Sequence, residues 1–202
     1  MDLILILILS YLVGAVPFAF VIGKVLYRTD VRCHGSGNLG GSNTGRVLGK
    51  KAGVAVMTLD ILKVTFVVFL ATRLSSHPWA AAFGALAAAV GHCYPVFLHF
   101  RGGKAVATMY GLLFGLWVCM GYSPLTFFLP LVTFLVVLYL FRIVSLSSMV
   151  SAAAAVIYLW LTGAHPSVVT AGLLFTLLIV LRHRENIGRM RRGTENKVRW
   201  IR

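Results

Sequence analysis

The chain has 202 residues, of which 59% are hydrophobic and only 12% charged, and its formal net charge is +14. A soluble domain of this length carries about twice as much charge and less apolar content. One soluble core cannot bury so many uninterrupted apolar stretches, so the bilayer has to be the solvent for most of this surface. The composition excludes an ordinary soluble fold and predicts a single membrane domain over residues 1–202.

The remaining composition excludes several kinds of site. The basic charge is spread over short loops with no aromatic-studded basic face, so we expect no nucleic-acid partner. Cys33, Cys93 and Cys119 form no C-x-x-C pair and are odd in number, which argues against a zinc site or a disulfide framework. With only five acidic residues and no pair placed for metal binding, we expect neither a metal nor a cofactor.

Seven apolar segments follow in chain order, separated by charges and by turn clusters of Ser, Gly and Pro. They lie at about 3–23, 52–72, 78–98, 105–122, 124–141, 144–162 and 166–181. Each is near the roughly 17–25 residues that a helix needs to cross the hydrocarbon. The first has no preceding basic residue and no obvious cleavage site, so we expect a retained helix rather than a signal peptide. The sequence predicts an all-α, polytopic membrane protein with seven transmembrane helices.

The lysines and arginines orient these spans. Of the 19, all but Lys63 and Arg73 follow spans one, three, five or seven. Cytoplasmic loops carry an excess of Lys and Arg. We therefore expect the N-terminus outside and the C-terminus in the cytoplasm.

The longest polar stretch runs from Asp30 to Arg46, and we interpret it as a phosphate-binding loop. Its glycines allow sharp turns and bring N–H groups close to an anion, and Arg46 supplies a charged fork suited to phosphate. The candidate residues are Gly35, Ser36, Gly37, Asn38, Ser42, Asn43 and Arg46. The glycines also match G-x-G-x-x-G, but a membrane helix precedes them instead of a strand, so we reject a dinucleotide site. The alternative is an ordinary flexible loop.

A second cluster extends from Gly91 to Thr108. Gly102, Gly103 and Lys104 at the start of the fourth span predict free N–H groups and a cation at a helix N-terminus, which favours an anion. It is not a P-loop, because the spacing and the strand are missing. We interpret His92 as a hydrogen-bonding prop, with a catalytic role as the alternative.

A third cluster begins at Arg182. His183 and Asn186 are three apart, so on a continuing helix they share a face and, with adjacent guanidiniums, suit a hydroxylated phosphate. The alternative is a basic tail with a capping Asn. We interpret the later run, Arg189, Arg191 and Arg192, as a topology signal attracted to anionic headgroups.

Two features lie inside or beside spans. Asp60 and Lys63 are three apart within the second span, and ionisable residues at that depth usually pair, so we expect a structural ion pair. Ser145 opens the sixth span, where it either caps the helix or reaches the site.

Familiar catalytic motifs are missing. The sequence has no H-x-x-x-x-D and no G-x-S-x-G nucleophile elbow. Many cations and few general bases favour a site that positions anions and stabilises charge.

These three clusters resemble the motifs of the bacterial membrane glycerol-3-phosphate acyltransferases that use acyl phosphate as donor. The resemblance covers nearly the whole chain, with motifs at 35–46, 91–104 and 182–195 separated by the expected spans. It implies transfer of a fatty acyl group from acyl phosphate to the 1-hydroxyl of glycerol 3-phosphate, giving lysophosphatidic acid and phosphate. This is the first committed step of phospholipid synthesis, at the cytoplasmic face of the bacterial plasma membrane.

The resemblance also implies roles for individual residues. Acyl phosphate would be held by Ser36, Gly37, Ser42, Gly102 and Lys104, and glycerol 3-phosphate by Arg46, Lys104, Ser145, His183 and Asn186. The catalytic set would be Ser36, Lys104, His183 and Asn186, with Gly35, Asn38, Asn43, His92, Gly103 and Thr108 as further binding residues. The chain departs from the usual pattern at Gly41-Ser42, Val64 and Ala105, and Ser42 keeps the hydroxyl of the usual Thr.

Acyl phosphate is already activated, so the site needs no protein nucleophile and can act by positioning and charge stabilisation. We expect a substrate phosphate oxygen to take the hydroxyl proton, with His183 as the alternative base. A soluble acyl-phosphate synthase is a candidate partner. A transporter for an organic phosphate or anion is the alternative function, disfavoured because the cationic groups sit at the cytoplasmic edge and no internal repeat is visible. A lipid-scaffolding role leaves the three clusters unexplained.

Overall fold

The computed structural model describes residues 3–198, and within this range all regular secondary structure is helical. The helices are α1 (Leu3–Gly14), α2 (Phe18–Tyr27), η1 (Val31–Cys33), α3 (Gly41–Leu48), α4 (Lys50–Leu74), α5 (Pro78–Cys93), η2 (Val96–Leu98), α6 (Val106–Met120), α7 (Leu125–Phe141), α8 (Val144–Leu161), α9 (Pro166–Arg182) and α10 (Arg184–Arg191), where η marks a 3-10 turn. The all-α prediction is confirmed. The predicted domain of 1–202 also includes residues 1–2 and 199–202, which lie outside the described residues.

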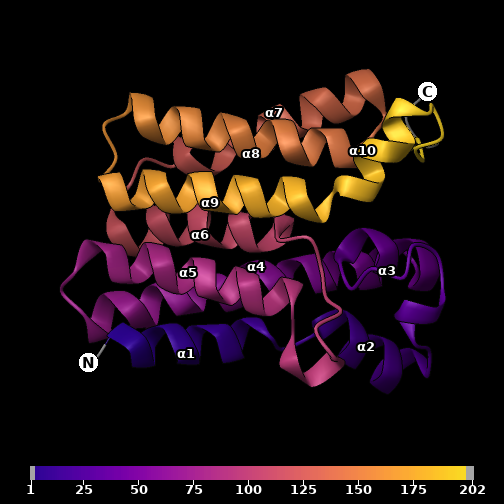
Figure 1. Ribbon diagram of the computed structural model, residues 1–202, viewed down its shortest axis with the longest axis horizontal. Coiled ribbons are helices and arrows are strands. Elements are labelled where there is room, and N and C mark those ends of the chain that lie inside the picture. Colours follow the sequence, from indigo (N-terminus) through magenta and orange to yellow (C-terminus); the bar gives the residue numbers. More distant parts are fainter. Residues whose placement is uncertain (1–2, 199–202) are drawn as a thin grey trace.

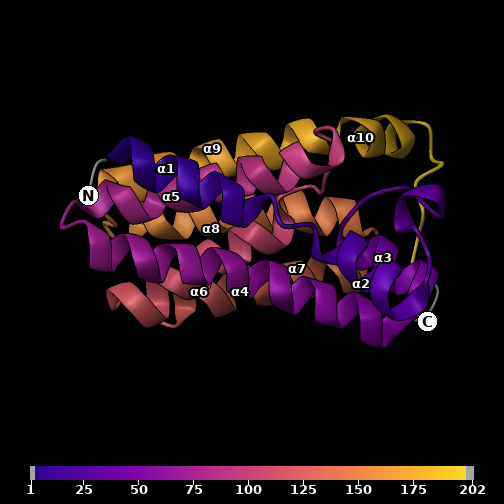
Figure 2. The same ribbon diagram turned by 90° about the horizontal axis from the view of Figure 1, so that it is seen from below.

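The long helices lie side by side along one axis (Figure 1). Among them α1 packs on α5, α4 on α6 and α7 on α8, and α5 also contacts α4, α6 and α9. The two chain ends lie at opposite ends of the bundle, and the short helices α2, α3 and α10 gather at the C-terminal end in both views (Figures 1 and 2). The segments that follow α1, α5, α7 and α9 are therefore brought together at that end, and the turns after α4, α6 and α8 lie at the other (Figure 1).

Small side chains place α5 inside the bundle. Its buried residues include Ala81, Ala85 and Ala88. A Cβ added at Gly14 of α1 would overlap the backbone of Ala88, and one added at Gly91 would overlap the backbone of Tyr11. In lipid the hydrophobic effect does not drive apolar helices together. Close approach at small residues lets them associate through van der Waals packing instead.

The outside of the bundle is apolar, as a lipid-facing surface requires. Many large apolar side chains are about half exposed, for example those of Leu62, Phe66, Leu135 and Leu177. A water-soluble monomer rarely exposes apolar side chains in such large continuous patches. By length and composition, four helical segments would cross a membrane: Leu3–Tyr27, Lys50–Leu74, Trp79–Leu98 and Val144–Leu161. The bent pair α9 and α10 would make a fifth, and α6 and α7 are shorter apolar helices.

The first predicted span, 3–23, is wrong as one continuous helix. The helix stops at Gly14 and restarts at Phe18. Pro17 lacks an N–H and disfavours helical backbone at the preceding residue. The freed carbonyl of Val16 accepts a hydrogen bond from Lys63 Nζ at 3.0 Å, so the break is satisfied by a side chain from α4.

The other six predicted spans each coincide with one helix, α4 to α9. The third ends at Cys93, five residues before the predicted limit. Tyr94 leaves the helical region, with φ −132° and ψ 61°, because Pro95 restricts the residue before it. The chain from there to α6 is consequently free to fold back over the end of the bundle.

Candidate active site

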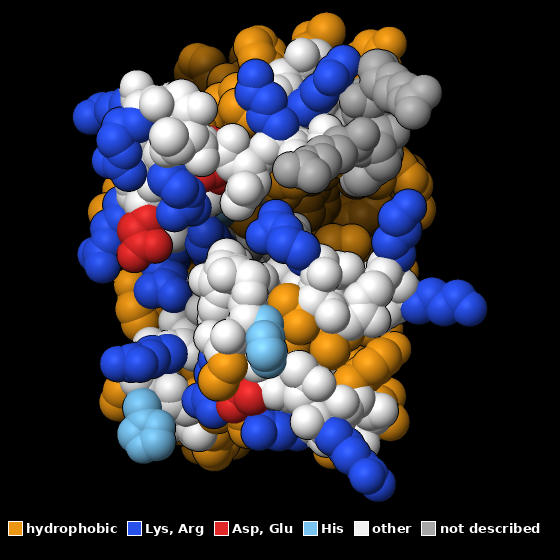
Figure 3. All heavy atoms as spheres, turned by 90° about the vertical axis from the view of Figure 1, so that its right-hand side faces the viewer, with side chains coloured by type: hydrophobic (Ala, Val, Ile, Leu, Met, Phe, Trp, Pro, Cys, Tyr) orange, Lys and Arg blue, Asp and Glu red, His pale blue; other side chains and the backbone are white. Residues whose placement is uncertain are grey.

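The end of the bundle that carries the loops is strongly basic. Figure 3 views this end directly and shows Lys and Arg side chains spread over it, around a recess floored by hydrophobic side chains. The three polar clusters of the sequence come from the segments that meet here (Figures 1 and 2). The recess is thus bordered by cations and opens onto an apolar interior.

The first cluster folds around a buried amide. Asn43 donates from Nδ2 to the carbonyl of Val31 at 3.0 Å and to that of His34 at 3.2 Å, and its Oδ1 accepts from the Ser36 N–H at 2.8 Å. Gly35 adopts a positive φ of 61°, which only glycine takes without strain. Asn43 therefore holds the loop from inside, and its own polar atoms are already paired.

The second half of this polar stretch is helical, which differs from the prediction of a loop throughout. Residues 41–48 form α3, which lies against α4. Gly45 and Gly53 approach so closely that a Cβ on Gly53 would stand 2.6 Å from the Gly45 Cα. Ser42 and Arg46 are four apart on α3, so they share a face, and their side chains are exposed, as is that of Ser36.

The second cluster differs from the prediction that Gly102 and Gly103 have free N–H groups. The Gly102 N–H donates to the Cys93 carbonyl at 3.1 Å, and the Gly103 N–H donates to the His92 carbonyl at 2.9 Å. These glycines therefore satisfy the last carbonyls of α5. The free N–H groups belong instead to the first turn of α6, which begins at Val106 directly after Lys104 and Ala105.

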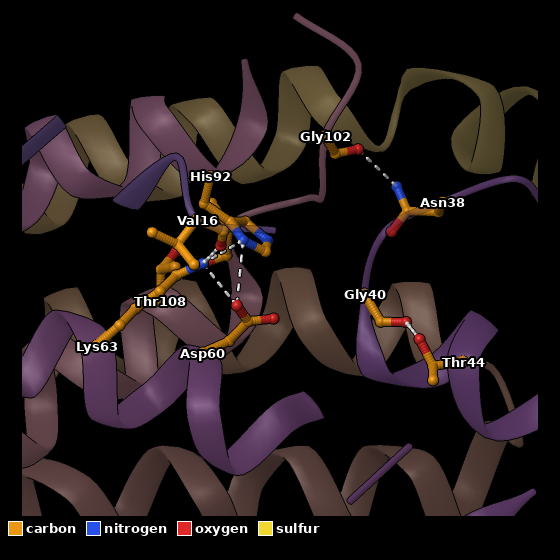
Figure 4. A network of polar contacts seen from close by, with 10 residues as sticks. Val16, Asn38, Gly40, Thr44, Asp60, Lys63, His92, Gly102 and Thr108 are labelled. Carbon is orange, nitrogen blue, oxygen red and sulfur yellow. Dashed lines mark hydrogen bonds and ion pairs between the residues drawn. The ribbon is translucent and has the colours of Figure 1, made fainter. Parts of the chain in front are cut away.

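Other polar groups clamp the same segment through its carbonyls. Arg182 donates from Nε to Gly103 O at 3.0 Å and from a terminal nitrogen to Gly102 O at 3.2 Å. Its guanidinium also lies over the Tyr94 ring, 4.9 Å from the centroid. Asn38 Nδ2 lies 3.4 Å from Gly102 O, which links the first cluster to the second (Figure 4). The planar fork of Arg182 is the kind of group that suits such a two-pronged contact.

A buried ionic group lies beneath this segment. Lys63 Nζ is 2.6 Å from Asp60 Oδ1 and 3.2 Å from His92 Nδ1, and all three side chains are buried (Figure 4). The predicted Asp60–Lys63 pair is confirmed. A Cβ added at Gly103 would overlap the His92 ring, so this glycine rests directly on the imidazole. The geometry supports His92 as a prop, because the ring connects the ion pair to the segment that leads to Lys104.

Thr108 is also buried, and its hydroxyl donates to the Ala105 carbonyl at 2.9 Å. This bond lies within the first turn of α6. Its one hydroxyl proton is therefore used locally.

The third cluster is not on a continuing helix. The axis bends by 58° between α9 and α10, with His183 at the break. His183 is buried, and its Nδ1 lies 2.8 Å from the Ile179 carbonyl. A carbonyl only accepts hydrogen bonds, so Nδ1 carries the proton in the neutral ring and Nε2 keeps an acceptor lone pair.

Asn186 on α10 brings the second and third clusters together. Its Oδ1 accepts from Lys104 Nζ at 2.5 Å, and its Nδ2 donates to Glu195 Oε1 at 2.6 Å. Ser145 donates to the same Glu195 oxygen at 2.8 Å. Ser145 therefore reaches the cluster and does not cap α8, whose N-cap position is Ile143.

Sequence reasoning misses Glu195 as a site residue and does not foresee a contact of Arg189 with it. Arg189 Nε donates to Glu195 Oε2 at 2.7 Å, so this arginine pairs within the cluster instead of serving only topology and headgroup attraction. The i,i+3 spacing of Asn186 and Arg189 on one helix indicates a shared face. No local signal indicates that Glu195, beyond the end of α10, folds back onto them.

Charge and burial shift the pKa values of two groups in this cluster. Burial, followed by the nearby Arg189 guanidinium, lowers the pKa of the Lys104 ammonium below its ordinary value. Burial opposes ionisation of Glu195, but hydrogen bonds from Asn186, Arg189 and Ser145 outweigh it and lower the pKa of that carboxyl. Glu195 is therefore a carboxylate at neutral pH.

Several side-chain hydrogen bonds connect the second cluster to the third, whereas the first cluster is connected to the second through Asn38. Lys104, Ser145 and Asn186 belong to one hydrogen-bonded group, and His183 lies at the foot of the helix that carries Asn186. Within residues 3–198, the side chains of Ser42 and Arg46 make no hydrogen bond. Asn38 provides the one side-chain hydrogen bond among these residues from the first cluster to the second.

Comparison with known proteins gives a consistent result. A family model described as glycerol-3-phosphate acyltransferase matches residues 4–193. A glycerol-3-phosphate acyltransferase of Geobacillus kaustophilus is 51% identical over 199 residues, covering 97% of this chain and 96% of that protein. A protein of the same name from Listeria monocytogenes is 43% identical over 204 residues, with 99% and 98% covered.

Solved structures show the same fold. The crystal structure of PlsY (YgiH), an integral membrane glycerol 3-phosphate acyltransferase, in its glycerol 3-phosphate form has a TM-score of 0.90 at 36% identity, covering 98% of this chain and 96% of that one. Its lysophosphatidic acid form has a TM-score of 0.88 at the same identity. The likeness extends over the whole helical bundle, so the chain is an integral membrane protein of the glycerol-3-phosphate acyltransferase family.

Proposed function

We propose that this protein transfers a fatty acyl group from acyl phosphate to the 1-hydroxyl of glycerol 3-phosphate, giving lysophosphatidic acid and inorganic phosphate. The observation that carries the proposal is the contact of Lys104 with Asn186, which places a partly buried cation among hydrogen-bonding side chains at the basic end of a membrane bundle. The family and its solved relatives support the acceptor and the product. The acyl-phosphate donor is supported by Lys104 and the free N–H groups at the start of α6, which together suit a phosphate leaving group.

In this reaction the acceptor hydroxyl oxygen attacks the carbonyl carbon of the donor. A C–O bond forms, the bond from that carbon to the phosphate oxygen breaks, and phosphate leaves with the electron pair. The hydroxyl proton passes to a phosphate oxygen. The protein contributes position and charge stabilisation, which together can account for most of a rate enhancement of this kind.

We assign the residues accordingly. Lys104 contacts the phosphate groups, and the free N–H groups at the start of α6 lie beside it. Asn186, His183 and Ser145 orient glycerol 3-phosphate, with His183 Nε2 able to accept a hydrogen bond from a substrate hydroxyl. The exposed first-cluster residues Ser36, Ser42 and Arg46 add further groups for the phosphates.

We further propose that one domain crosses the bacterial plasma membrane seven times, with the N-terminus outside and the site at the cytoplasmic face. Chain ends at opposite ends of the bundle and the concentration of basic side chains at one end support this orientation (Figures 1 and 3). A soluble acyl-phosphate synthase at the same surface would supply the donor. A transporter is not supported, because the polar cluster lies at one end of the bundle and not at its midplane.

The test is phosphate release by the purified protein in lipid nanodiscs, supplied with acyl phosphate with and without glycerol 3-phosphate. We expect release to require the acceptor and to match lysophosphatidic acid formation one for one, measured by mass spectrometry. A parallel reaction with acyl-coenzyme A as donor should give no product. Folded protein that forms lysophosphatidic acid only from acyl-coenzyme A would overturn the donor assignment, and folded protein with no product from either donor would overturn the proposed function.

Raising the pH is expected to lower kcat/KM for glycerol 3-phosphate as the Lys104 ammonium loses its proton, which gives the pH profile a descending limb on its alkaline side. The ammonium is the active form, so activity is present below its pKa and lost above it. Because burial lowers this pKa, the loss begins at a lower pH than for a free lysine. The guanidinium of Lys104→Arg does not titrate in this range, so the limb should vanish in that variant even at reduced activity. An unchanged limb in Lys104→Arg would contradict the assignment.

A further inference from the structure

Glu195 lies in the C-terminal segment, outside every predicted span, yet its side chain is only 7% exposed. Both of its carboxylate oxygens are used: Oε1 accepts from Asn186 and Ser145, and Oε2 accepts from Arg189. The donors come from two helices, α8 and α10. The carboxylate thus connects parts of the site that are distant in sequence.

The segment that carries Glu195 is fixed on both sides. The Thr194 N–H donates to the Arg189 carbonyl at 2.9 Å, and the Val198 N–H donates to the Arg142 carbonyl at 2.8 Å. The first bond ties the segment to α10, and the second ties it to the turn between α7 and α8. Backbone anchoring before and after the residue distinguishes this arrangement from a loose tail that happens to touch the site.

The chemistry of the three central side chains allows only one arrangement. An ammonium can only donate hydrogen bonds and a carboxylate can only accept them, whereas an amide does one at each end. With Glu195 fixed on Nδ2, the amide of Asn186 must present Oδ1 to Lys104 (2.5 Å). Without the carboxylate, the amide could turn its NH₂ group toward the ammonium and lose the contact.

We propose that Glu195 is a positioning residue that holds the Asn186 amide in this orientation and thereby fixes Lys104 for the phosphate of glycerol 3-phosphate. The inference rests on the proposed function, and it adds a residue that makes no contact with substrate in that scheme. Glu195 also balances the positive charges of Lys104 and Arg189, which would otherwise repel each other.

The first test separates kcat and KM in Glu195→Gln, with Glu185→Gln as the matched control. Glu185 is exposed on the same helix α10 and makes no side-chain hydrogen bond among residues 3–198. We expect Glu195→Gln to raise the KM for glycerol 3-phosphate roughly tenfold or more, the effect of losing one hydrogen bond with a charged group. The KM for acyl phosphate should rise less, because Lys104 is assigned to both phosphates whereas Asn186 orients only glycerol 3-phosphate, and Glu185→Gln should match the wild type.

The second test is a double-mutant cycle with Asn186→Ala. If Glu195 acts through the amide, Glu195→Gln should cost little activity once Asn186 is alanine, so the two effects are strongly non-additive. A residue that only supports folding would lower the melting temperature, change both KM values to a similar extent and give additive effects.

The outcomes distinguish the two proposals. Wild-type protein that forms no lysophosphatidic acid overturns the proposed function. Active wild-type protein with a Glu195→Gln variant that behaves like Glu185→Gln, or with additive effects in the cycle, overturns the positioning role alone. Calorimetric titration of glycerol 3-phosphate into the wild type and Glu195→Gln provides a readout that does not depend on acyl transfer, and equal affinities would also overturn it.

Discussion

Replacing Lys104 with alanine is expected to lower kcat/KM for acyl transfer by roughly 10²–10³-fold, the usual cost of removing one group that stabilises developing charge. The variant lacks the partly buried ammonium that contacts Asn186, so the substrate phosphates lose the cation that lies beside the N–H groups of α6. Steady-state kinetics with each substrate varied in turn measures the effect. We expect both KM values to rise, because Lys104 is assigned to the phosphate groups of both substrates.

The control for this variant is Arg101→Ala, which removes a cation three residues earlier in the same loop. Arg101 is exposed and makes no side-chain hydrogen bond among residues 3–198, so the loss of one positive charge near the site is matched. Arg101→Ala should stay within about threefold of the wild type, as expected for a screened surface charge. Equal losses in the two variants would show that the loop acts through its general charge and not through Lys104.

Replacing Asp60 with asparagine is expected to reduce the free energy of unfolding by about 3–5 kcal/mol, because it leaves the Lys63 ammonium buried without its counter-ion. The Asp60–Lys63 pair is almost completely buried, with side-chain exposures of 2% and 4%. The same ammonium also holds the Val16 carbonyl at the break between α1 and α2 and contacts His92. Unfolding in mixed detergent micelles, followed by tryptophan fluorescence, measures the change.

Asp30→Asn offers the matched comparison. Asp30 also forms an ion pair, with Arg32 Nη2 at 2.8 Å, but 33% of the Arg32 side chain is exposed. Asparagine can still accept the Arg32 N–H that Asp30 caps, and a pair this exposed contributes about 0–1 kcal/mol. A double variant, Asp60→Asn with Lys63→Met, removes both buried charges and should recover part of the loss. An Asp60→Asn effect no larger than that of Asp30→Asn would contradict the buried-pair interpretation.

The helices of the bundle are largely predictable, because apolar length is a local property. Six predicted spans coincide with α4 to α9, and each is bounded by residues that leave the helix for local reasons. The break at Pro17 has a local signal as well, but the apolar run continues through it and conceals the change of direction. Hydrophobicity tells whether a segment enters lipid, and backbone chemistry tells whether it stays helical there.

The candidate site is predictable in its residue types but not in its contacts. The spacing of the basic and polar clusters is enough to select Lys104, His183 and Asn186 as candidates. The N–H groups of Gly102 and Gly103 are a different case, because they donate to carbonyls of α5. Whether a loop N–H is free depends on which helix end lies beside it, and the local sequence does not contain that information.

The sequence by itself determined that the protein lies in a membrane and is helical. It also determined the basic end of the bundle and the three clusters that relate the chain to a family. These follow from side-chain chemistry and local spacing. The tertiary structure alone decided that Arg182 clamps the Gly102–Gly103 segment, that His92 supports Gly103, and that Glu195 returns to Asn186. Such contacts join residues up to about 80 positions apart in the chain, and their geometry is fixed by how the helices pack rather than by any local pattern.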